Sequence, residues 1–548
     1  MQQGLQLSRR RFLSGIGMAA GAYASSSVAA FAMHGGSMGG MKKMAPNWAS
    51  PNFNADVDIE LACRPGEARI FDGPTTGVWR YVANLVKGPE NSLTPLPDSY
   101  LGAVMRFWNG QKIRIRLRNE LPEPTIAHWH GLHVPMLMDG HPSYAIDPGE
   151  TFVYEFEMRN RAGLYFYHPH THGATATQVY RGLAGAILVS DDEEKALDLP
   201  AGEFEIPIVL QDRSFDENNQ LVYAGGMHDR MIGFQGDHIL VNGRPDYAID
   251  VASRAYRLRI LNGSNSRIYK LAWDDASPIT VIGVDGGLLE RPEIKPYVML
   301  APGERLDVWA DFSGRSVGSR LVMRSAPFFG VLPKMAQHMM GGMMMRSRLP
   351  VGGDYPLFTI RVARAVSDSP ALPQRLTSID RLRVENVANP NNPVPIAISE
   401  APMAMLLNGR PYAADDAQPR ERIPVDTLQL IEILHDHGGM GMGRGMGMMG
   451  GMGMMGGMGG MMSMTHPIHL HGQQFQILSR SADDADPESY ATMSEGLIGS
   501  GWKDTVLVTP GERVRIIKPF GDFKGAFMYH CHNLEHEDMG MMRQFIVE

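Results

Sequence analysis

Cysteine is scarce in this chain, since only Cys63 and Cys531 occur among 548 residues. If Cys531 is a metal ligand, Cys63 has no partner and no intramolecular disulfide forms, although we expect the protein to work in an oxidising compartment. Cys63 lies in a predicted strand, IELACRPGEARIF. We expect it to pack as a small apolar residue rather than to act chemically.

Two further absences exclude classes of partner. Lysine and arginine form no basic stripe and the formal net charge is −8, so the sequence has no electrostatic footprint for nucleic acid. No long apolar run follows the first thirty-odd residues. We therefore expect the mature chain to have no membrane span.

The first residues have the features of a targeting peptide. SRRRFL at 8–13 contains a twin-arginine pattern, and Ala30-Phe31-Ala32 fits a small-x-small cleavage site. A permanent membrane anchor is the alternative, but Gly and Ser interrupt the apolar stretch 12–32. We predict a signal peptide over 1–32 and export to the periplasm by the twin-arginine route.

Glycine and proline are abundant, and related segments recur between them. Three segments share a Pro-Gly-Glu turn before an alternating strand: DPGETFVYEFEM at 147–158, APGERLDVWADF at 301–312 and TPGERVRIIKPF at 509–520. Two other pairs are similar: GQKIRIRLRN at 110–119 with AYRLRILNGS at 255–264, and NGRP at 242–245 and 408–411. Alternating patterns between turns indicate antiparallel strands, and so long a repeat favours tandem β-sandwiches over a solenoid.

Polar stretches at 191–203 and 366–379 interrupt the strand-like patterning with proline or runs of charge. We therefore predict an all-β protein with domains at 46–195, 204–365 and 380–548. The third domain contains an insert at 435–464 that is almost wholly Met and Gly. So much glycine argues against regular structure in the insert.

The most informative segment is HCHNLEHEDMGMM at 530–542. It places one thiol, three imidazoles and a thioether at short spacings: His530, Cys531, His532, His536 and Met541. Two imidazoles, a thiolate and a weak thioether are the ligands of a blue-copper centre, and His466 is the candidate for the second imidazole. Because neighbouring side chains of a strand point to opposite faces, Cys531 would bind one metal while His530 and His532 reach metals on the other side.

Three more His-x-His pairs occur, in HWHG at 128–131, YHPH at 167–170 and HPIHLHG at 466–472. Side chains at i and i+2 of a strand share a face roughly 7 Å apart and can reach adjacent metals. The four pairs supply enough imidazoles for a three-metal cluster with open positions for oxygen. One such pair alone would be assigned to the surface, but coincidence does not explain four pairs beside a blue-copper signature.

With these motifs in this order across three repeats, the chain resembles the three-domain multicopper oxidases. The resemblance implies cupredoxin-like Greek-key β-sandwiches and four copper ions, one type 1, one type 2 and two type 3. The implied ligands are His466, Cys531, His536 and axial Met541 for type 1; His128 and His469 for type 2; and His130, His168 and His532, with His170, His471 and His530, for type 3. The first and third domains would share the cluster, and the middle domain, which has no His-x-His pair, would be a spacer.

The resemblance also implies a reaction. Single electrons would enter at Cys531, pass to His530 and His532, and reduce dioxygen to water in groups of four. Asp139 and Glu537 match positions that relay protons in similar bacterial enzymes. A solvated turn residue and a surface acid are the alternative interpretations of these two.

The Met-Gly insert indicates the electron donor, because soft thioethers select Cu(I). The insert ends at Met461, Met462 and Met464, immediately before His466. Met-rich inserts in the third domain are typical of the periplasmic copper efflux oxidases, which this chain resembles, and Met464 matches a substrate-copper methionine of that group. The aspartate usual two residues earlier is Met462 here, and an idle insert is the alternative.

Three functions are compatible with these patterns. The first is oxidation of Cu(I) in copper tolerance, the second is laccase-like oxidation of phenols or of metal ions such as Fe(II) or Mn(II), and the third is copper sequestration without turnover. The expected partners are dioxygen and either Cu(I) or a small reducing substrate, and we expect a monomer. A two-domain copper nitrite reductase is disfavoured, because it needs neither eight cluster imidazoles nor a third repeat.

Overall fold

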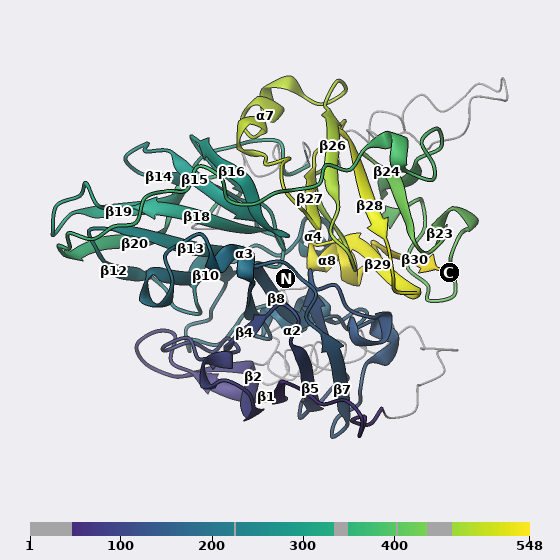
Figure 1. Ribbon diagram of the computed structural model, residues 1–548, viewed down its shortest axis with the longest axis horizontal. Helices are drawn as coiled ribbons and strands as arrows, with labels where there is room; N and C mark the ends of the chain where they lie inside the picture. The colour runs from purple at the N-terminus through teal and green to yellow at the C-terminus, as the bar shows by residue number, and fades with distance from the viewer. Residues whose placement is uncertain (1–46, 224–225, 334–348, 402–403, 436–462) are drawn as a thin grey trace, which may run out of the picture. The chain divides into compact units, whose positions relative to one another are not determined.

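Strands make up most of the regular structure, as the alternating patterns predict. The computed structural model describes residues 47–223, 226–333, 349–401, 404–435 and 463–548 (Figure 1). The predicted signal peptide, Met461, Met462 and most of the Met-Gly insert lie outside these residues. Of the helices described, none is long and apolar enough to cross a membrane.

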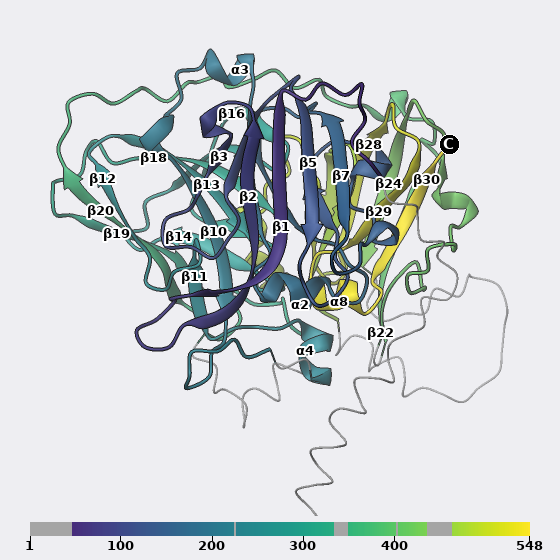
Figure 2. The ribbon, with the colours of Figure 1, turned by 90° about the horizontal axis from the view of Figure 1, so that it is seen from below.

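The first pair of sheets comes from residues 57–190 and encloses a core around Trp129, Tyr154 and Tyr167. One sheet has the order β2-β1-β5-β7, with β1 Val57–Ala68, β2 Thr76–Lys87, β5 Lys112–Asn119 and β7 Thr151–Glu157. The other has the order β3-β4-β9-β8-β6, with β3 Leu93–Thr94, β4 Val104–Trp108, β6 Ala127–His130, β8 Gly163–Pro169 and β9 Gly185–Ser190. Helix α2, Thr175–Tyr180, connects β8 to β9. Figure 2 shows the first of these sheets face on.

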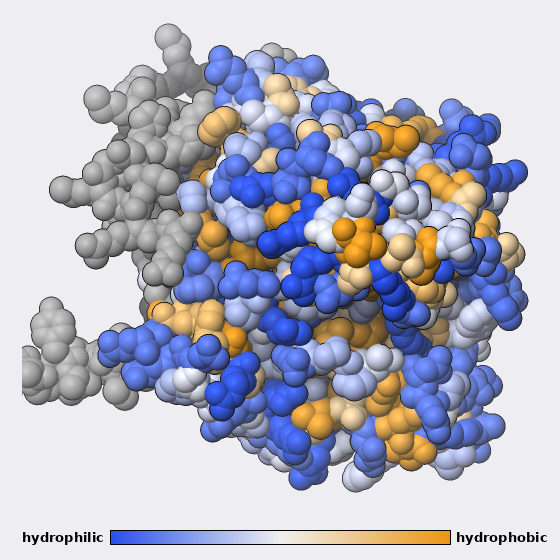
Figure 3. Space-filling model, turned by 90° about the vertical axis from the view of Figure 1, so that its left-hand side faces the viewer, coloured by the Kyte–Doolittle hydropathy of each residue, from blue (hydrophilic) through white to orange (hydrophobic). Residues whose placement is uncertain are grey.

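The second pair of sheets comes from residues 205–364 and is teal in Figure 1. One sheet has the order β11-β10-β13-β18-β15-β16, with β10 Glu205–Arg213, β11 His238–Val241, β13 Ala255–Asn262, β15 Ile279–Val284, β16 Gly287–Lys295 and β18 Arg305–Asp311. The other has the order β12-β20-β19-β14-β17, with β12 Ala248–Ala252, β14 Tyr269–Trp273, β17 Val298–Leu300, β19 Arg320–Ser325 and β20 Tyr355–Arg364. Helix α3, Asp192–Lys195, precedes these sheets, and α4, Met227–Ile232, lies between β10 and β11. On the face in Figure 3, apolar residues form small patches separated by hydrophilic ones.

The third pair comes from residues 394–547. One sheet has the order β22-β21-β24-β28-β26, with β21 Val394–Ala401, β22 Ala404–Leu407, β24 Thr427–His435, β26 Gln476–Ser481 and β28 Arg513–Phe520. The other has the order β23-β30-β29-β25-β27, with β23 Arg422–Ile423, β25 His466–Leu470, β27 Thr505–Val508, β29 Gly525–Cys531 and β30 Met542–Val547. Two short helices, α7 Pro487–Ala491 and α8 Leu534–Asp538, complete this part.

The three sandwiches share one topology, which confirms the predicted repeats and fold class. Each Pro-Gly-Glu turn leads into the equivalent strand, β7, β18 or β28, paired antiparallel to β5, β13 or β24. Both NGRP segments turn back after the equivalent strands β11 and β22, with positive φ at Asn242 and Gly243 and again at Asn408 and Gly409, as a type I′ hairpin turn requires. The strands of the described residues all fall within the three predicted domains, whose exact limits remain a prediction.

Apolar clusters join the sandwiches as well as filling them. Val209, Leu240 and Leu261 of the middle sandwich pack with Leu164 and Phe166 of the first. A second cluster joins middle residues, among them Met299 and Phe328, to Met493 and Leu507 of the third. These contacts hold in place the strands that bring distant histidines together.

Candidate metal centres

Two antiparallel strand pairs carry the histidines of the four motifs. In the first sandwich His128 on β6 lies opposite His168 on β8. In the third, His469 on β25 lies opposite His530 on β29. Alternation along β6 turns Trp129 into the core of the first sandwich, so the flanking histidines face the other way.

The eight imidazoles of these motifs meet in one buried cluster, as predicted. Each is at most 3% exposed: His128, His130, His168, His170, His469, His471, His530 and His532. Ring nitrogens of His128, His469 and His471 lie within 4.8 Å of one another, and so do those of His170, His471 and His530. The His532 ring packs against His130 and His168, with centroids 4.9 and 5.4 Å apart.

Hydrogen bonds on the outside of the cluster turn one nitrogen of four of the rings inward. Nδ1–H of His128, His168, His469 and His530 donates to the backbone oxygens of Asp139, Pro169, Asp504 and Cys531, over 2.6, 2.8, 2.9 and 3.0 Å. The inward Nε2 atoms of His128, His168 and His469 have no hydrogen-bond partner. Buried polar atoms are rarely left without a partner, so these nitrogens fit a metal.

His130 is turned the other way. Its Nε2 lies 3.1 Å from Oδ1 of Asp504, and its Nδ1 is the nitrogen without a partner. The donor set therefore includes one inward-facing Nδ1 among Nε2 atoms. The tautomer of His130 is decided by Asp504.

The charge state of the cluster also fits a metal. Burial is the largest effect on the pKa of these rings and lowers it for His128, His130, His168, His170, His469, His471 and His532. These seven imidazoles are neutral near pH 7, so each keeps a lone pair for a cation.

A second centre lies on the opposite face of β29. Nδ1 of His466 and of His536 lie 3.4 and 3.7 Å from Sγ of Cys531 and 3.3 Å from each other. Met541 is fully buried in the same apolar cluster as Cys531. The predicted two-imidazole, one-thiol set is therefore assembled, with a thioether close by.

The outer nitrogens of this centre are also bonded. Nε2 of His466 lies 2.8 Å from Oε1 of Glu400 on β21, and Nε2 of His536 lies 3.2 Å from the backbone oxygen of Met231 in α4. Burial raises the pKa of the Cys531 thiol. A thiolate at this position therefore requires a cation, and a coordinated thiol is deprotonated outright.

Comparisons with known proteins agree with this geometry. Two models of the multicopper oxidase family match residues 80–194 and 457–548. A laccase of Bacillus stratosphericus is 30% identical over an alignment of 506 positions, which covers 83% of this chain and 90% of the laccase. The chain belongs to the multicopper oxidase family. It is therefore an oxidoreductase with type 1, type 2 and type 3 copper.

The oxidase is also similar to solved structures. The McoA multicopper oxidase of Aquifex aeolicus superposes with a TM-score of 0.71 at 29% identity, over 92% of this chain and 100% of that one. A laccase-like multi-copper oxidase from Ochrobactrum sp. superposes with a TM-score of 0.69 at 27% identity, over the same shares of the two chains.

The oxidase buries both acids predicted to relay protons. The side chains of Asp139 and Glu537 are 2% exposed, which makes the solvated and surface interpretations wrong. Oδ2 of Asp139 lies 2.8 Å from Nδ1 of His471, and Oε2 of Glu537 lies 3.1 Å from Nδ1 of His530. Each acid thus contacts one cluster histidine on its outer side.

The two acids have opposite pKa shifts. Burial raises the pKa of Asp139 well above its ordinary value. Burial also acts on Glu537, but the neighbouring rings of His530 and His170 more than offset it and lower the pKa to about 2. The shifts favour the protonated acid at Asp139 and the carboxylate at Glu537, a division of roles typical of acid–base sites.

Three residues near the copper sites escaped sequence reasoning: Glu400, Asp504 and Arg305. None has a motif or a spacing to a histidine that would reveal it. The middle sandwich is the predicted spacer, and its described residues contribute no imidazole to either centre. Its Arg305, however, donates to Asp504 beside the cluster, and the backbone oxygen of its Met231 contacts His536 at the second centre. The histidines outside the ligand spacings have other partners: His133 with Asp522, His141 with Gln544 and His238 with Asp237.

A small cavity has His471 of the cluster in its wall. Its other walls include Gln473, Lys518 and Phe527. Nζ of Lys518 donates to the backbone oxygen of Gln473, and the side chain is buried. Burial lowers the pKa of this lysine to about 7.

Proposed function

We propose that the oxidase holds its coppers with the ligands predicted from the sequence. The support is a set of buried ring nitrogens that have no hydrogen-bond partner among the described residues, on His128, His130, His168, His469 and His532. The proposed ligands are His466, Cys531, His536 and Met541 for type 1; His128 and His469 for type 2; and His130, His168 and His532, with His170, His471 and His530, for type 3. So bound, copper supplies one-electron transfer at the first centre and oxygen reduction at the cluster.

The covalent chain joins the two centres at one tripeptide. His530 and His532 flank Cys531 directly, and strand alternation sends them to the opposite face. An electron entering at Cys531 therefore has only a few bonds to cross before it reaches a cluster histidine. No side chain has to move for this, because all three residues are buried.

Asp139 and Glu537 supply and accept protons beside the cluster. Protonated Asp139 holds its proton at Oδ1, the oxygen without a partner, while Oδ2 accepts from Nδ1–H of His471. The Glu537 carboxylate lies beside the same cluster, with Oε2 3.1 Å from Nδ1 of His530. The cavity beside His471 is the proposed route for dioxygen and water.

The substrate we propose is Cu(I). One observation carries this: Oε1 of Glu400 accepts the backbone N–H of Met464 over 2.7 Å and also contacts Nε2 of His466. The end of a methionine-rich segment is thus fixed against a type 1 ligand. Glu400 on β21 offers a carboxylate in place of the one missing at position 462, and the soft thioether of Met464 suits a cuprous ion.

A laccase-like oxidation of small reducing substrates is the second candidate. The Bacillus stratosphericus relative is a laccase, and it covers most of this chain. In that case the insert would not take part in electron entry. Sequestration without turnover is disfavoured because the chain belongs to an oxidase family, and groups of histidines with Cys531 that could hold metal ions support the same conclusion.

Replacing residues 438–462 by a short Gly-Ser linker separates the two candidates. The ends of the insert are adjacent, since Nε2–H of His435 donates to the backbone oxygen of Met464 over 2.6 Å, so a few residues can bridge them. The measurement is the steady-state rate with Cu(I), Fe(II), Mn(II) and a phenol. In the linker variant we expect kcat/KM for Cu(I) to fall at least tenfold, while the phenol is oxidised as fast as before or faster. Undiminished Cu(I) oxidation would refute capture by the insert. Met464→Leu, which keeps the fold but removes the thioether, is the matched single-residue variant.

The proposed location follows from the first residues of the sequence. The twin-arginine pattern at 8–13 indicates export to the periplasm, where copper tolerance would require Cu(I) oxidation. We propose that the oxidase acts as a monomer. Detection of the cleaved chain in a periplasmic fraction, and its loss with Arg9→Lys and Arg10→Lys, tests the route.

A further inference from the structure

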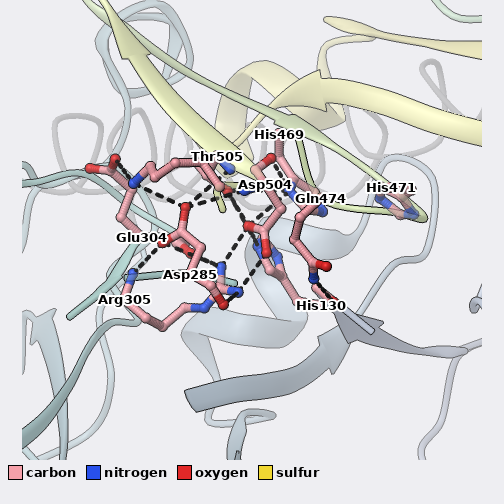
Figure 4. A network of polar contacts seen from close by, with 12 residues as sticks. His130, Asp285, Glu304, Arg305, His469, His471, Gln474, Asp504 and Thr505 are labelled. Carbon is pink, nitrogen blue, oxygen red and sulfur yellow. Dashed lines mark hydrogen bonds and ion pairs between the residues drawn. The ribbon is translucent and has the colours of Figure 1, made fainter. Parts of the chain in front are cut away.

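A buried polar network reaches from the middle sandwich to the copper cluster (Figure 4). Both terminal nitrogens of Arg305, on β18, donate to Asp504: Nη1 to Oδ1 and Nη2 to Oδ2, each over 2.6 Å. Asp504 in turn contacts Nε2 of His130 through Oδ1 and Nδ1 of His469 through its backbone oxygen. Thr505 lies between the same two rings, with Oγ1 3.3 Å and 3.2 Å from those nitrogens.

From this arrangement we infer that Arg305 of the middle sandwich is a positioning residue of the oxygen-reducing cluster, acting through Asp504 on His130 and His469. The inference rests on the ligand assignment proposed above. The Asp504 carboxylate accepts a hydrogen bond from the outer nitrogen of His130, Nε2, and this leaves Nδ1 of that ring for the metal. The guanidinium holds the carboxylate in one orientation, because a bidentate pair fixes both oxygens.

Arg305 itself cannot shift, because each of its donors has an acceptor. Beyond the two bonds to Asp504, Nε donates to the backbone oxygen of Leu164, Nη1 to that of Gly303 and Nη2 to that of Asp285, over 3.0, 2.9 and 2.9 Å. The residue is fully buried. It is therefore a rigid support that contacts the first, middle and third sandwiches at once.

Asp504 is not a copper ligand in this interpretation. One of its oxygens lies close enough to His130 and His469 for a shared metal. Both oxygens, however, are engaged by Arg305, and the positive guanidinium disfavours a second cation on the same carboxylate. The acid orients ligands instead of binding the metal.

The turn before β18 touches the cluster independently. A Cβ added at Gly303 would lie 2.9 Å from the ring of His532, so only glycine allows the turn to pack against that histidine. The Pro-Gly-Glu turn of the middle sandwich thus packs against His532. Arg305, two residues after Gly303, orients His130 and His469 through Asp504. A sandwich without ligands shapes the cluster in this way.

The test compares Arg305→Met and Asp504→Asn with a matched control, Arg257→Met. Arg257 is a buried arginine of the same sandwich that pairs with Asp307 and contacts none of the proposed ligands. The measurements are copper per chain, the type 2 signal in electron paramagnetic resonance, and copper release to a chelator, with the blue absorption band as an internal standard for the type 1 site. Removing a partner that orients a ligand typically costs roughly 10–100-fold in metal affinity.

We expect Arg305→Met and Asp504→Asn to keep the blue band but to release cluster copper at roughly 10–100-fold lower chelator concentration, with an altered type 2 signal. Arg257→Met should keep all copper. Unchanged cluster copper in Asp504→Asn, or equal losses in Arg257→Met and Arg305→Met, would overturn the inference. If Arg305→Met fails to fold, Asp504→Asn decides, because it preserves the shape of the side chain. Full cluster copper in His469→Ala would instead refute the ligand assignment itself.

Discussion

Oε1 of Glu400 lies 2.8 Å from Nε2 of His466, on the far side of the imidazole from Cys531. The side chain of Glu400 is 3% exposed, so this contact is shielded from solvent. Because the same oxygen accepts the amide of Met464, one acid connects the type 1 site to the residue through which a cuprous donor would arrive. The contact spans 66 positions of sequence.

Glu400→Gln should raise the reduction potential of the type 1 site. A carboxylate that accepts from Nε2–H makes the imidazole a stronger donor and favours the oxidised metal. Turnover of Cu(I) should fall roughly tenfold, and a redox titration of the blue band measures the first effect directly. Glu432→Gln is the control, since Glu432 pairs with Arg513 and Arg515 on β28. If the reduction potential of the type 1 site is unchanged in Glu400→Gln, Glu400 has no role in electron entry.

Cys531→Ser should abolish the blue band and oxygen consumption while leaving cluster copper bound. The hydroxyl cannot replace the thiolate that ligates the first centre, whereas the proposed cluster ligands are all retained. Cys63→Ala is the matched control, because Cys63 is equally buried but lies in the core of the first sandwich. It should keep both properties. A serine variant that still consumes oxygen would contradict entry at Cys531.

Asp139→Asn and Glu537→Gln should both slow oxygen reduction, by roughly 100-fold or more, because each removes a proton-transfer group. Their effects on stability should have opposite signs. The raised pKa of Asp139 means that the wild-type carboxyl destabilises the fold as pH rises above about 4, so the Asn variant gains stability relative to wild type there.

The lowered pKa of Glu537 stabilises the fold fully above pH 4.5, and this stability is lost as pH falls toward about 2. The Gln variant should therefore be less stable than wild type at pH 7, by about 3 kcal/mol, and equal to it near pH 2. Chemical unfolding of metal-free protein between pH 2 and 8 measures both trends. Parallel pH profiles for the two variants would contradict the assigned charges.

Lys518→Met should stabilise the protein. The pKa of Lys518 is lowered from 10.5 to about 7, so protonation in the unfolded chain costs stability below pH 10.5, and the cost is greatest below about pH 7. The gain should be of the order of 4 kcal/mol at pH 6 and disappear near pH 10.5. Thermal unfolding at both pH values checks this.

Lys503→Met is the informative contrast to Lys518→Met. Lys503 is also buried, but it pairs with Asp285 and Glu304 at 3.0 and 2.8 Å, and these carboxylates raise its pKa. Replacing Lys503 leaves these buried carboxylates without their partner, and it should lower the free energy of unfolding by about 3 kcal/mol. Stabilisation by both substitutions would show that burial alone, without pairing, governs these lysines.

Much of the fold could be predicted because its signals are local. Apolar and polar residues that alternate between Pro-Gly-Glu and Asn-Gly turns define strands. The recurrence of these signals along the sequence predicts three sandwiches. The exact domain limits stay a prediction, since the sandwiches are joined by apolar clusters that no composition change marks.

The placement of the proposed copper ligands was equally predictable, because each pair is set by strand periodicity and needs only neighbours in sequence. His128 and His130, or His530 and Cys531, have a fixed relation as soon as the strand forms. The roles of Asp139 and Glu537 could not be settled in this way. Burial distinguishes a relay acid from a surface acid, and burial is a property of the packed molecule.

The sequence by itself determined the metal chemistry and the fold class, since thiolate, imidazole and thioether groups at strand spacing leave few alternatives. Only the tertiary structure decided what orients those groups. Arg305 and Asp504 are 199 residues apart, and Glu400 and His466 come from different sheets. Such pairs are held by long-range packing that buries opposite charges and hydrogen-bonding partners together, and no local pattern in the chain encodes that packing.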